Sequence, residues 1–398
     1  MTLVIFIVEE IFAWYSNQRL DEVKKQYFNT IKSSKYISWQ NKVLSTLYGN
    51  DSFRKLFSKN YPACCFKVAN SVKYPFIKFG FIENYELPQI KENKQQRLYI
   101  KMLRNVIKRP LVKGYAMQQL YLNENNEIVN FKASICNYHQ NIVTSHILEY
   151  ELYQLYINYP NFPTDDAKKL LQHLKHRQAI HSDKTNLQDL MIKTAENFFP
   201  LIGVQAFLVF KDYSHSENPE WKVIIIKRSE DVAIKPGYFQ FIPSGGFEAF
   251  AQQGLNDSWV LKNEFNLEKA IYRELAEEVY GKEECQHNEN GYDSDSIIFD
   301  QQIIALVRQA IAKQTASFDC VGIVIDLVTL RAEMSFLIII DEPQFSSQAR
   351  LGSIESSLIS SIRISEIQSR IADSPLNPSS AGLFKLVIDS NLLHKLNI

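Results

Sequence analysis

Three glutamates at helical spacing are the residues of this 398-residue sequence best suited to chemistry. Glu274, Glu277 and Glu278 lie within Leu267–Gly281, LEKAIYRELAEEVYG. Positions i, i+3 and i+4 share one face of a helix, so the three carboxylates would crowd one patch and repel one another. A hard divalent cation, Mg²⁺ or Mn²⁺, prefers such oxygen ligands. The spacing favours a metal site, with a solvated acidic helix face as the alternative.

The neighbours of these glutamates are typical of a helix that packs against a core. Ile271, Leu275 and Val279 recur at i, i+4 and i+8 and form one apolar stripe. Arg273 precedes Glu277 by four residues and can hold that carboxylate through a hydrogen-bonded ion pair. The segment therefore predicts a helix with an apolar face and a charged face.

A glycine-rich segment precedes the helix. Tyr238–Glu248, YFQFIPSGGFE, is a short apolar strand that runs into a Pro-Ser-Gly-Gly turn. At Ser244, Gly245 and Gly246 the backbone amides can approach an anion closely, because glycine has no side chain. A strand, a Gly-Gly turn and a carboxylate-bearing helix together predict a diphosphate–metal site.

These residues resemble the Nudix box, written G-x5-E-x7-R-E-U-x-E-E-x-G-U, with U an aliphatic residue. Gly246 matches the first glycine, and Arg273–Glu278, RELAEE, matches R-E-U-x-E-E. The first glycine of the box lies fourteen residues before the arginine, whereas Gly246 lies twenty-seven before Arg273. We therefore expect an insertion of thirteen residues within Glu248–Phe265, as a loop or a short helix.

Two other positions depart from the box. Phe265 stands where the box has its first glutamate, so that role is vacant or falls to Glu264 or Glu248. Tyr280 stands where the box has its last glycine, and Gly281 follows one place late.

The resemblance implies a Nudix-like domain over residues 184–398, an α/β/α sandwich around a mixed sheet. It implies hydrolysis of a nucleoside diphosphate linked to another moiety. In that reaction Glu274, Glu277 and Glu278 would hold Mg²⁺ or Mn²⁺, and Arg273 would belong to the catalytic set. The backbone of Ser244–Gly246 would approach the substrate phosphates.

Two alternatives stay open beside this interpretation. Lys227 and Arg228 end a predicted strand and could bind substrate phosphates, or they could be ordinary strand-end surface residues. The changed residues Phe265 and Tyr280 favour a non-catalytic module that binds a nucleotide-like ligand, with a basic first domain as its regulatory output. The sequence has no G-x-S-x-G, H-E-x-x-H, Walker or G-x-G-x-x-G motif, so it offers no support for the chemistry that depends on them.

The charge distribution predicts two domains. The net charge is zero, but residues 1–185 hold 26 Lys and Arg against 15 Asp and Glu, and the remaining residues hold 18 against 29. A polar run, HSDKTN, lies between the basic and acidic halves. We therefore predict a basic α+β domain over 1–183 and the Nudix-like domain over 184–398, with different partners or with each other as partner.

A basic helix is the most regular feature of the first half. Over residues 92–108, basic residues recur along one face and apolar residues along another. The basic row is Lys94, Arg97, Lys101, Arg104 and Lys108. It could bind nucleic acid or another polyanion, but no aromatic residue interleaves it for base stacking, which favours a solvated face. Strands over 114–122 and 128–138 should form a hairpin after it.

The four most apolar runs of the second half, 203–210, 222–226, 321–328 and 334–340, should be buried strands. The five cysteines include no C-x-x-C pair, which fits reduced thiols in a cytoplasmic protein. The apolar start, Met1–Tyr15, is interrupted by Glu9 and Glu10 and is too short to cross a membrane. We therefore expect no membrane association.

Overall fold

The computed structural model describes residues 19–69, 76, 79–104, 107, 111–181, 197–214, 218–229, 235–249, 256–280, 302–348, 356–372 and 375–396. The expectations for Met1–Tyr15, Lys108 and Gly281 fall outside these residues.

The first half combines helices with short strands. Its elements are α2 (Ser34–Tyr48), β1 (Arg54–Leu56), β2 (Lys59–Tyr61), β3 (Ala63–Lys67), β4 (Phe81–Asn84), α3 (Lys94–Leu103), β5 (Lys113–Leu122), β6 (Ile128–Asn137), α4 (Tyr138–Asn141), a π-helical turn η2 (Ile142–His146), α5 (Ile147–Asn158), α6 (Ala167–His173) and α7 (Lys175–His181).

The second half carries most of the large sheet. Its strands are β7 (Gly203–Asp212), β8 (Glu220–Arg228), β9 (Phe239–Phe241), β10 (Ser244–Gly246), β11 (Ala316–Asp326), β12 (Arg331–Ile340) and β13 (Ser356–Arg363). Its helices are α9 (Ser258–Glu264), α10 (Leu267–Glu274), the π-helical turn η3 (Leu275–Val279), α12 (Gln302–Ala312), α13 (Pro343–Gln348), α14 (Ile367–Arg370) and α15 (Pro378–Asp389).

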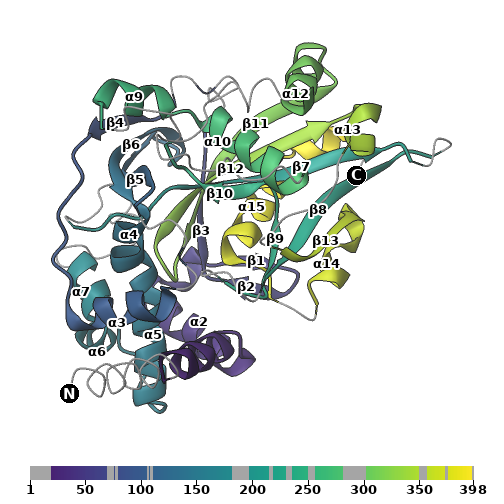
Figure 1. Ribbon diagram of the computed structural model, residues 1–398. Helices are drawn as coiled ribbons and strands as arrows, with labels where there is room; N and C mark the ends of the chain where they lie inside the picture. The colour runs from purple at the N-terminus through teal and green to yellow at the C-terminus, as the bar shows by residue number, and fades with distance from the viewer. Residues whose placement is uncertain are drawn as a thin grey trace, which may run out of the picture.

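The central sheet is mixed and has eight strands. Its order is β13-β8-β7-β12-β11-β3, with β10 paired to β7 and β9 paired to β8. Strands β7 and β12 run parallel, whereas the other pairs are antiparallel. Helices lie on both faces of this sheet (Figure 1), which confirms the predicted α/β class with a mixed sheet.

Alternate residues of β7 explain the two layers of helices. Val204, Ala206 and Leu208 belong to the apolar cluster that includes α10. Phe207 and Val209 belong to the cluster that includes α15. Successive side chains of a strand point to opposite faces, so α10 and α15 cover opposite faces of the sheet. All eight residues from Gly203 to Phe210 are buried, as predicted for a central strand.

Most of the expected elements are present, and one is not as predicted. The four apolar runs are strands β7, β8, β11 and β12, and β5 and β6 form the expected antiparallel hairpin. The Pro-Ser-Gly-Gly segment is not a turn, because Ser244–Gly246 forms strand β10 against β7.

The basic row lies on α3 with its charges toward solvent. Lys94, Arg97, Lys101 and Arg104 are exposed, whereas Tyr99 and other apolar residues of the helix face the core. This arrangement is the amphipathic helix that the sequence predicted. Binding of nucleic acid to it stays a prediction.

The two halves of the chain pack closely against each other. Strand β3 of the first half is the edge strand of the large sheet, paired with β11 from Gly322 to Asp326. Strand β5 contacts the second half through Tyr115, whose N–H donates to Phe247 O (3.1 Å) and whose carbonyl accepts from Ile202 N (2.7 Å). One apolar cluster contains residues from both halves.

Buried charges also bridge the two halves. Lys235 Nζ pairs with a carboxylate oxygen of Glu149 on α5 at 2.5 Å, and both side chains are almost fully buried. Burial opposes the charge of Lys235, but Glu149 and Asp326 raise its pKa above the ordinary value. Arg177 of α7 is fully buried and donates to Leu327 O (3.1 Å) and to Val328 O in the β11–β12 turn. Removing the Glu149 carboxylate would leave the buried charge of Lys235 without its ion-pair partner, which costs about 3–5 kcal/mol.

Two smaller features complete the fold. Among the residues that the structure describes, no helix is both long enough and apolar enough to cross a membrane. Cys64, Cys65, Cys136 and Cys320 are free thiols.

The division at residue 183 stays a proposal, and it predicts that a 184–398 fragment folds by itself. The packing between the two halves predicts instead that such a fragment is destabilised. A 184–398 fragment lacks β3 and the first-half share of the common core. We expect its thermal transition to be broader and to lie at least about 5 °C below that of the full chain, because apolar surface is exposed. Addition of a 1–183 fragment should restore part of the difference. A fragment that melts as sharply and at the same temperature as the full chain would contradict this expectation.

Candidate active site at strand β10 and the box helix

Strand β10 places the Ser-Gly-Gly residues in a fixed register. Ser244 lies opposite Gln205 of β7, Gly245 opposite Val204, and Gly246 opposite Gly203. Gly245 therefore faces α10, whereas Ser244 and Gly246 face the opposite side of the sheet.

Arg273 connects β10 to the helix formed by α10 and η3 (Leu267–Val279), which is called the box helix below. Its Nη2 donates to Gly246 O (2.8 Å) and to Glu274 Oε1 (2.9 Å). Arg273 and Glu274 are only 5% and 8% exposed, so their charges are largely withdrawn from water. Burial opposes the charge of Arg273, yet Glu274, Glu277 and Glu248 raise its pKa above the ordinary value. The guanidinium is therefore the cation around which the carboxylates are arranged.

Gly245 gives the Glu274 carboxylate its place. A Cβ on Gly245 would lie 2.2 Å from the carboxylate carbon, far inside van der Waals contact. The glycine is therefore needed for close approach of the carboxylate to the strand, and not for an unusual backbone angle. Glu278 contacts the same strand, since one of its carboxylate oxygens accepts from Ser244 N at 2.7 Å.

The box helix changes from α-helical to π-helical geometry after Glu274. It is α-helical to Glu274 and continues as a π-helical turn over Leu275–Val279. A π turn has more residues per turn than an α-helix, so it rotates later side chains relative to earlier ones. Glu278 is buried beside Glu274, whereas Glu277 is only partly buried. Two of the three predicted carboxylates thus contact β10, and the third, Glu277, lies close enough to Arg273 to raise its pKa.

The insertion in the box is a helix that docks on the first half. Helix α9 follows β10, and Tyr115 Oη of β5 donates to Leu261 O at 2.8 Å. Phe265 ends this helix, and its ring lies 4.9–5.7 Å from the rings of Tyr115, Phe131 and Phe247. The residue at the position of the first box glutamate therefore anchors the insertion to β5 and β6.

Of the two candidates for the vacant glutamate role, Glu248 is the one near the site. A Cβ on Gly246 would lie 2.7 Å from a carboxylate oxygen of Glu248, and Glu248 contributes to the raised pKa of Arg273. Glu264 instead pairs with Lys269 at 3.3 Å.

Arg228 reaches the site through one glutamine. Its Nη1 donates to Gln240 Oε1 (3.0 Å), and Gln240 Nε2 donates to Ser244 Oγ. Lys227 is partly buried beside it at the end of β8. Arg228 is therefore close enough to affect a ligand at Ser244.

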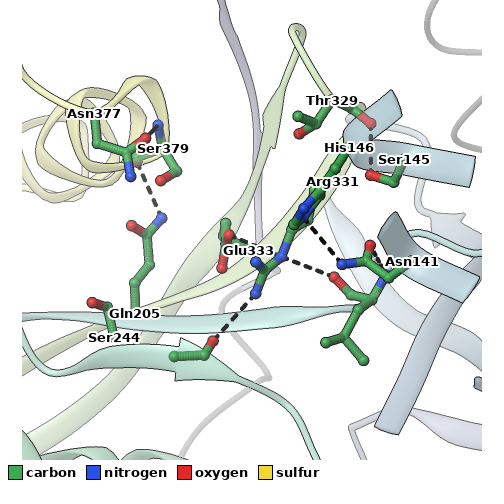
Figure 2. A network of polar contacts seen from close by, with 12 residues as sticks. Asn141, Ser145, His146, Gln205, Ser244, Thr329, Arg331, Glu333, Asn377 and Ser379 are labelled. Carbon is green, nitrogen blue, oxygen red and sulfur yellow. Dashed lines mark hydrogen bonds and ion pairs between the residues drawn. The ribbon is translucent and has the colours of Figure 1, made fainter. Parts of the chain in front are cut away.

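Arg331 and Glu333, which no pattern in the sequence singled out, lie at the start of β12 (Figure 2). Arg331 Nη2 donates to Gly245 O (3.4 Å), and its Nε lies 3.3 Å from Glu333 Oε1. Burial raises the pKa of Glu333 to about 7, although Arg331 and Arg228 oppose the rise. The available signal was the pair of charges at alternate positions in RAEMSFLIII, an otherwise apolar strand.

The residues at β10 suit a divalent cation in donor type but do not gather into a site for one. The buried carboxylates of Glu274 and Glu278 supply hard oxygen donors, and Gly245 leaves room for the first of them beside the strand. In the part of the chain that the structure describes, no three His, Cys, Asp or Glu side chains form a group that could hold a metal. The predicted Mg²⁺ or Mn²⁺ site is thus not confirmed and stays a proposal.

No protein-family model and no curated protein matches the chain. Among solved structures, it is similar to a NUDIX hydrolase from Alicyclobacillus acidocaldarius, with 15% identity and a TM-score of 0.27, over 50% of this chain and 96% of that one. A mutT/nudix family protein from Listeria innocua shares 15% identity with a TM-score of 0.26, over 50% and 98% of the two chains.

A third similar structure is a bifunctional NMN adenylyltransferase/ADP ribose pyrophosphatase from Francisella tularensis, complexed with AMP and a manganese ion. It shares 14% identity at a TM-score of 0.29, over 63% of this chain and 49% of that one.

Removal of the Phe265 ring should destabilise the fold. Phe265→Ala should lower the free energy of unfolding by about 3 kcal/mol, because the ring packs among three aromatic neighbours. Urea unfolding measures the change. Trp259→Ala is the matched control, since Trp259 lies on the same inserted helix but is 69% exposed; its effect should stay within about 0.5 kcal/mol. Equal effects of the two substitutions would show that Phe265 is not an anchor.

The network in Figure 2 includes a buried histidine that makes stability depend on pH. Burial, with Arg331 and Lys235, lowers the pKa of His146 to about 3. His146 is thus neutral in the folded protein, whereas the unfolded chain binds a proton below about pH 6.5. The free energy of unfolding should therefore fall by about 1.4 kcal/mol per pH unit as the pH drops from 6.5 toward 3.

Urea unfolding at several pH values between 7 and 4.5 tests the role of His146. His146→Gln should reduce the dependence of the free energy of unfolding on pH by about 1.4 kcal/mol per pH unit, because glutamine does not titrate. His173→Gln, at an exposed histidine, is the control and should keep the wild-type slope. An unchanged slope in His146→Gln would contradict the assignment.

Proposed function

We propose that this protein hydrolyses a nucleoside diphosphate linked to another moiety, at the site formed by β10 and the box helix. One observation carries the proposal. Arg273, Glu274 and Glu278, at the R, E and final E of the box motif, all converge on the backbone of Ser244–Gly246. The residues that resemble the Nudix box are therefore close together despite the insertion between them.

The reaction is phosphoanhydride hydrolysis. A water molecule attacks phosphorus, a carboxylate takes its proton, the bridging P–O bond breaks, and the leaving phosphate departs with the bridging oxygen. Arg273 holds the carboxylate of Glu274 beside β10, so that carboxylate is oriented before the substrate binds. Arg228, linked to Ser244 through Gln240, supplies positive charge for the phosphates, with Lys227 as a second candidate.

We further propose Glu274, Glu277 and Glu278 as the residues that would hold Mg²⁺ or Mn²⁺. When bound, such a cation supplies charge neutralisation for the phosphate oxygens and lowers the pKa of water. Glu278 holds Ser244 N–H, and Arg273 holds Glu274, so both carboxylates have fixed places at the strand.

A second function is favoured by a different observation. Glu274 and Glu278 already have protein partners, and the ring of Phe265 replaces a box carboxylate. These features favour a domain that binds a nucleotide-like ligand without turnover. In that case the basic first half would transmit the effect of ligand binding, either by contacting another partner or by acting through the second half.

The test is a screen of nucleoside diphosphate derivatives with Mg²⁺ or Mn²⁺, with the products identified by mass spectrometry. For a substrate that turns over, Glu274→Gln, Glu277→Gln and Glu278→Gln should each lower kcat/KM at least tenfold, or about 1.4 kcal/mol. Glu268→Gln is the control, because Glu268 lies on the same helix but pairs with Arg308 at 3.7 Å.

Turnover within about threefold of wild type in all three variants would contradict the catalytic assignment. Nucleotide binding without products in any reaction would instead support the non-catalytic function.

A further inference from the structure

Arg331 crosses one strand to reach the candidate site. It begins β12, whose residue Glu333 lies opposite Gly203 of β7, and β10 lies on the other side of β7. A Cβ on Gly203 would lie 2.7 Å from Arg331 Nη2 and 1.6 Å from a carboxylate oxygen of Glu333. Gly203 therefore leaves the room through which Arg331 contacts the carbonyl of Gly245.

Side chains hold each of the three residues of β10 through its backbone. The N–H of Ser244 is bound by Glu278, and the carbonyl of Gly246 by Arg273. The carbonyl of Gly245, between them, is bound by Arg331. Two of these contacts come from the box helix on one face, and only the contact of Arg331 comes from β12. Arg331 thus fixes the strand from the side that the box does not reach.

Arg331 also connects β10 to the first half of the chain. Its Nε donates to Leu201 O (3.0 Å), and the N–H of the same residue, Leu201, donates to Asn141 Oδ1 (2.9 Å). Asn141 is fully buried and its Nδ2 lies 3.1 Å from His146 Nε2. His146 is neutral, so this ring nitrogen accepts the hydrogen bond from Asn141. A continuous set of contacts therefore runs from η2 through Leu201 and Arg331 to Gly245 (Figure 2).

We propose that Arg331 is a positioning residue for the candidate active site. It sets the position of Gly245, on which the carboxylate of Glu274 lies, and it links that position to the first half of the chain. The proposal rests on the proposed hydrolase function for its kinetic consequence, but not for its structural consequence. A planar guanidinium is required because one side chain must donate to two carbonyls, that of Gly245 in β10 and that of Leu201 just before β7.

The first experiment compares steady-state kinetics of the full-length wild type and Arg331→Lys, with a substrate found in the nucleoside diphosphate screen. A lysine keeps the charge but cannot reproduce the paired donor geometry. We expect kcat to fall at least tenfold while KM changes less than about threefold, because the residue orients Glu274 without touching the substrate.

Arg54→Lys is the matched control. Arg54 also donates to backbone carbonyls, those of Asp51 and Phe53, but it lies at β1, away from the site. It should keep the wild-type kcat. A rise in KM with unchanged kcat in Arg331→Lys would overturn the proposal, because it would mean that Arg331 contacts the substrate.

The second experiment needs no substrate. Hydrogen–deuterium exchange of peptides spanning residues 239–249 should be at least about tenfold faster in Arg331→Lys than in wild type, and unchanged in Arg54→Lys. Gly203→Ala, which removes the room for the Arg331 side chain, should give the same result without changing the arginine. Unchanged exchange in both Arg331→Lys and Gly203→Ala would overturn the positioning role.

The two experiments separate the two proposals. If the wild type hydrolyses no compound in the screen but exchange at 239–249 accelerates in both variants, the hydrolase function fails and the positioning of β10 stands. If turnover is found and kcat and exchange are both unchanged in Arg331→Lys, the positioning role fails and the hydrolase function stands.

Discussion

The buried guanidinium of Arg273 is the contact on which the arrangement of the candidate site depends. A charge that is 5% exposed is tolerated only when partners replace its hydration. Gly246 O and Glu274 provide those partners, one from strand β10 and one from the helix itself. The strand and the helix therefore have to lie together, whatever the length of the chain between them. This requirement explains how thirteen additional residues can be inserted without separating the two halves of the motif.

The insertion has a structural role of its own. Helix α9 follows β10 in the sequence and contacts β5 through Leu261. Phe265 ends α9 and precedes the box helix. An aromatic ring in place of a carboxylate exchanges a potential catalytic group for a packing contact with the first half. Together with the β3–β11 pairing and the buried Lys235–Glu149 ion pair, this contact makes the first half part of the environment of the site. The opposite charges of the halves had left each half open as the partner of the other, but they did not predict a shared sheet and a common apolar core.

Local patterns predicted the elements well, and the tertiary relations less so. Continuous apolar runs such as GVQAFLVF indicate buried strands, because a strand with both faces covered has apolar residues at successive positions. The spacing of Arg273 and Glu274 identified residues that do meet β10. The sequence did not reveal that Ser244–Gly246 forms a strand, because its pairing with β7 is a long-range contact that overrides the turn preference of glycine. Nor did it reveal the π-helical turn over Leu275–Val279, or the reach of Arg331 across Gly203.

The position of β3 has a consequence for how the chain reaches its native state. This edge strand precedes most of the sheet in the sequence, and its partner β11 is made only after β7, β8 and the box helix. Pairings between such distant segments raise contact order and slow folding, because a long loop must close before they form. Until β11 is available, β3 presents unpaired backbone donors and acceptors that could pair with another chain. We therefore expect the interval between the emergence of β3 and that of β11 during synthesis to favour aggregation.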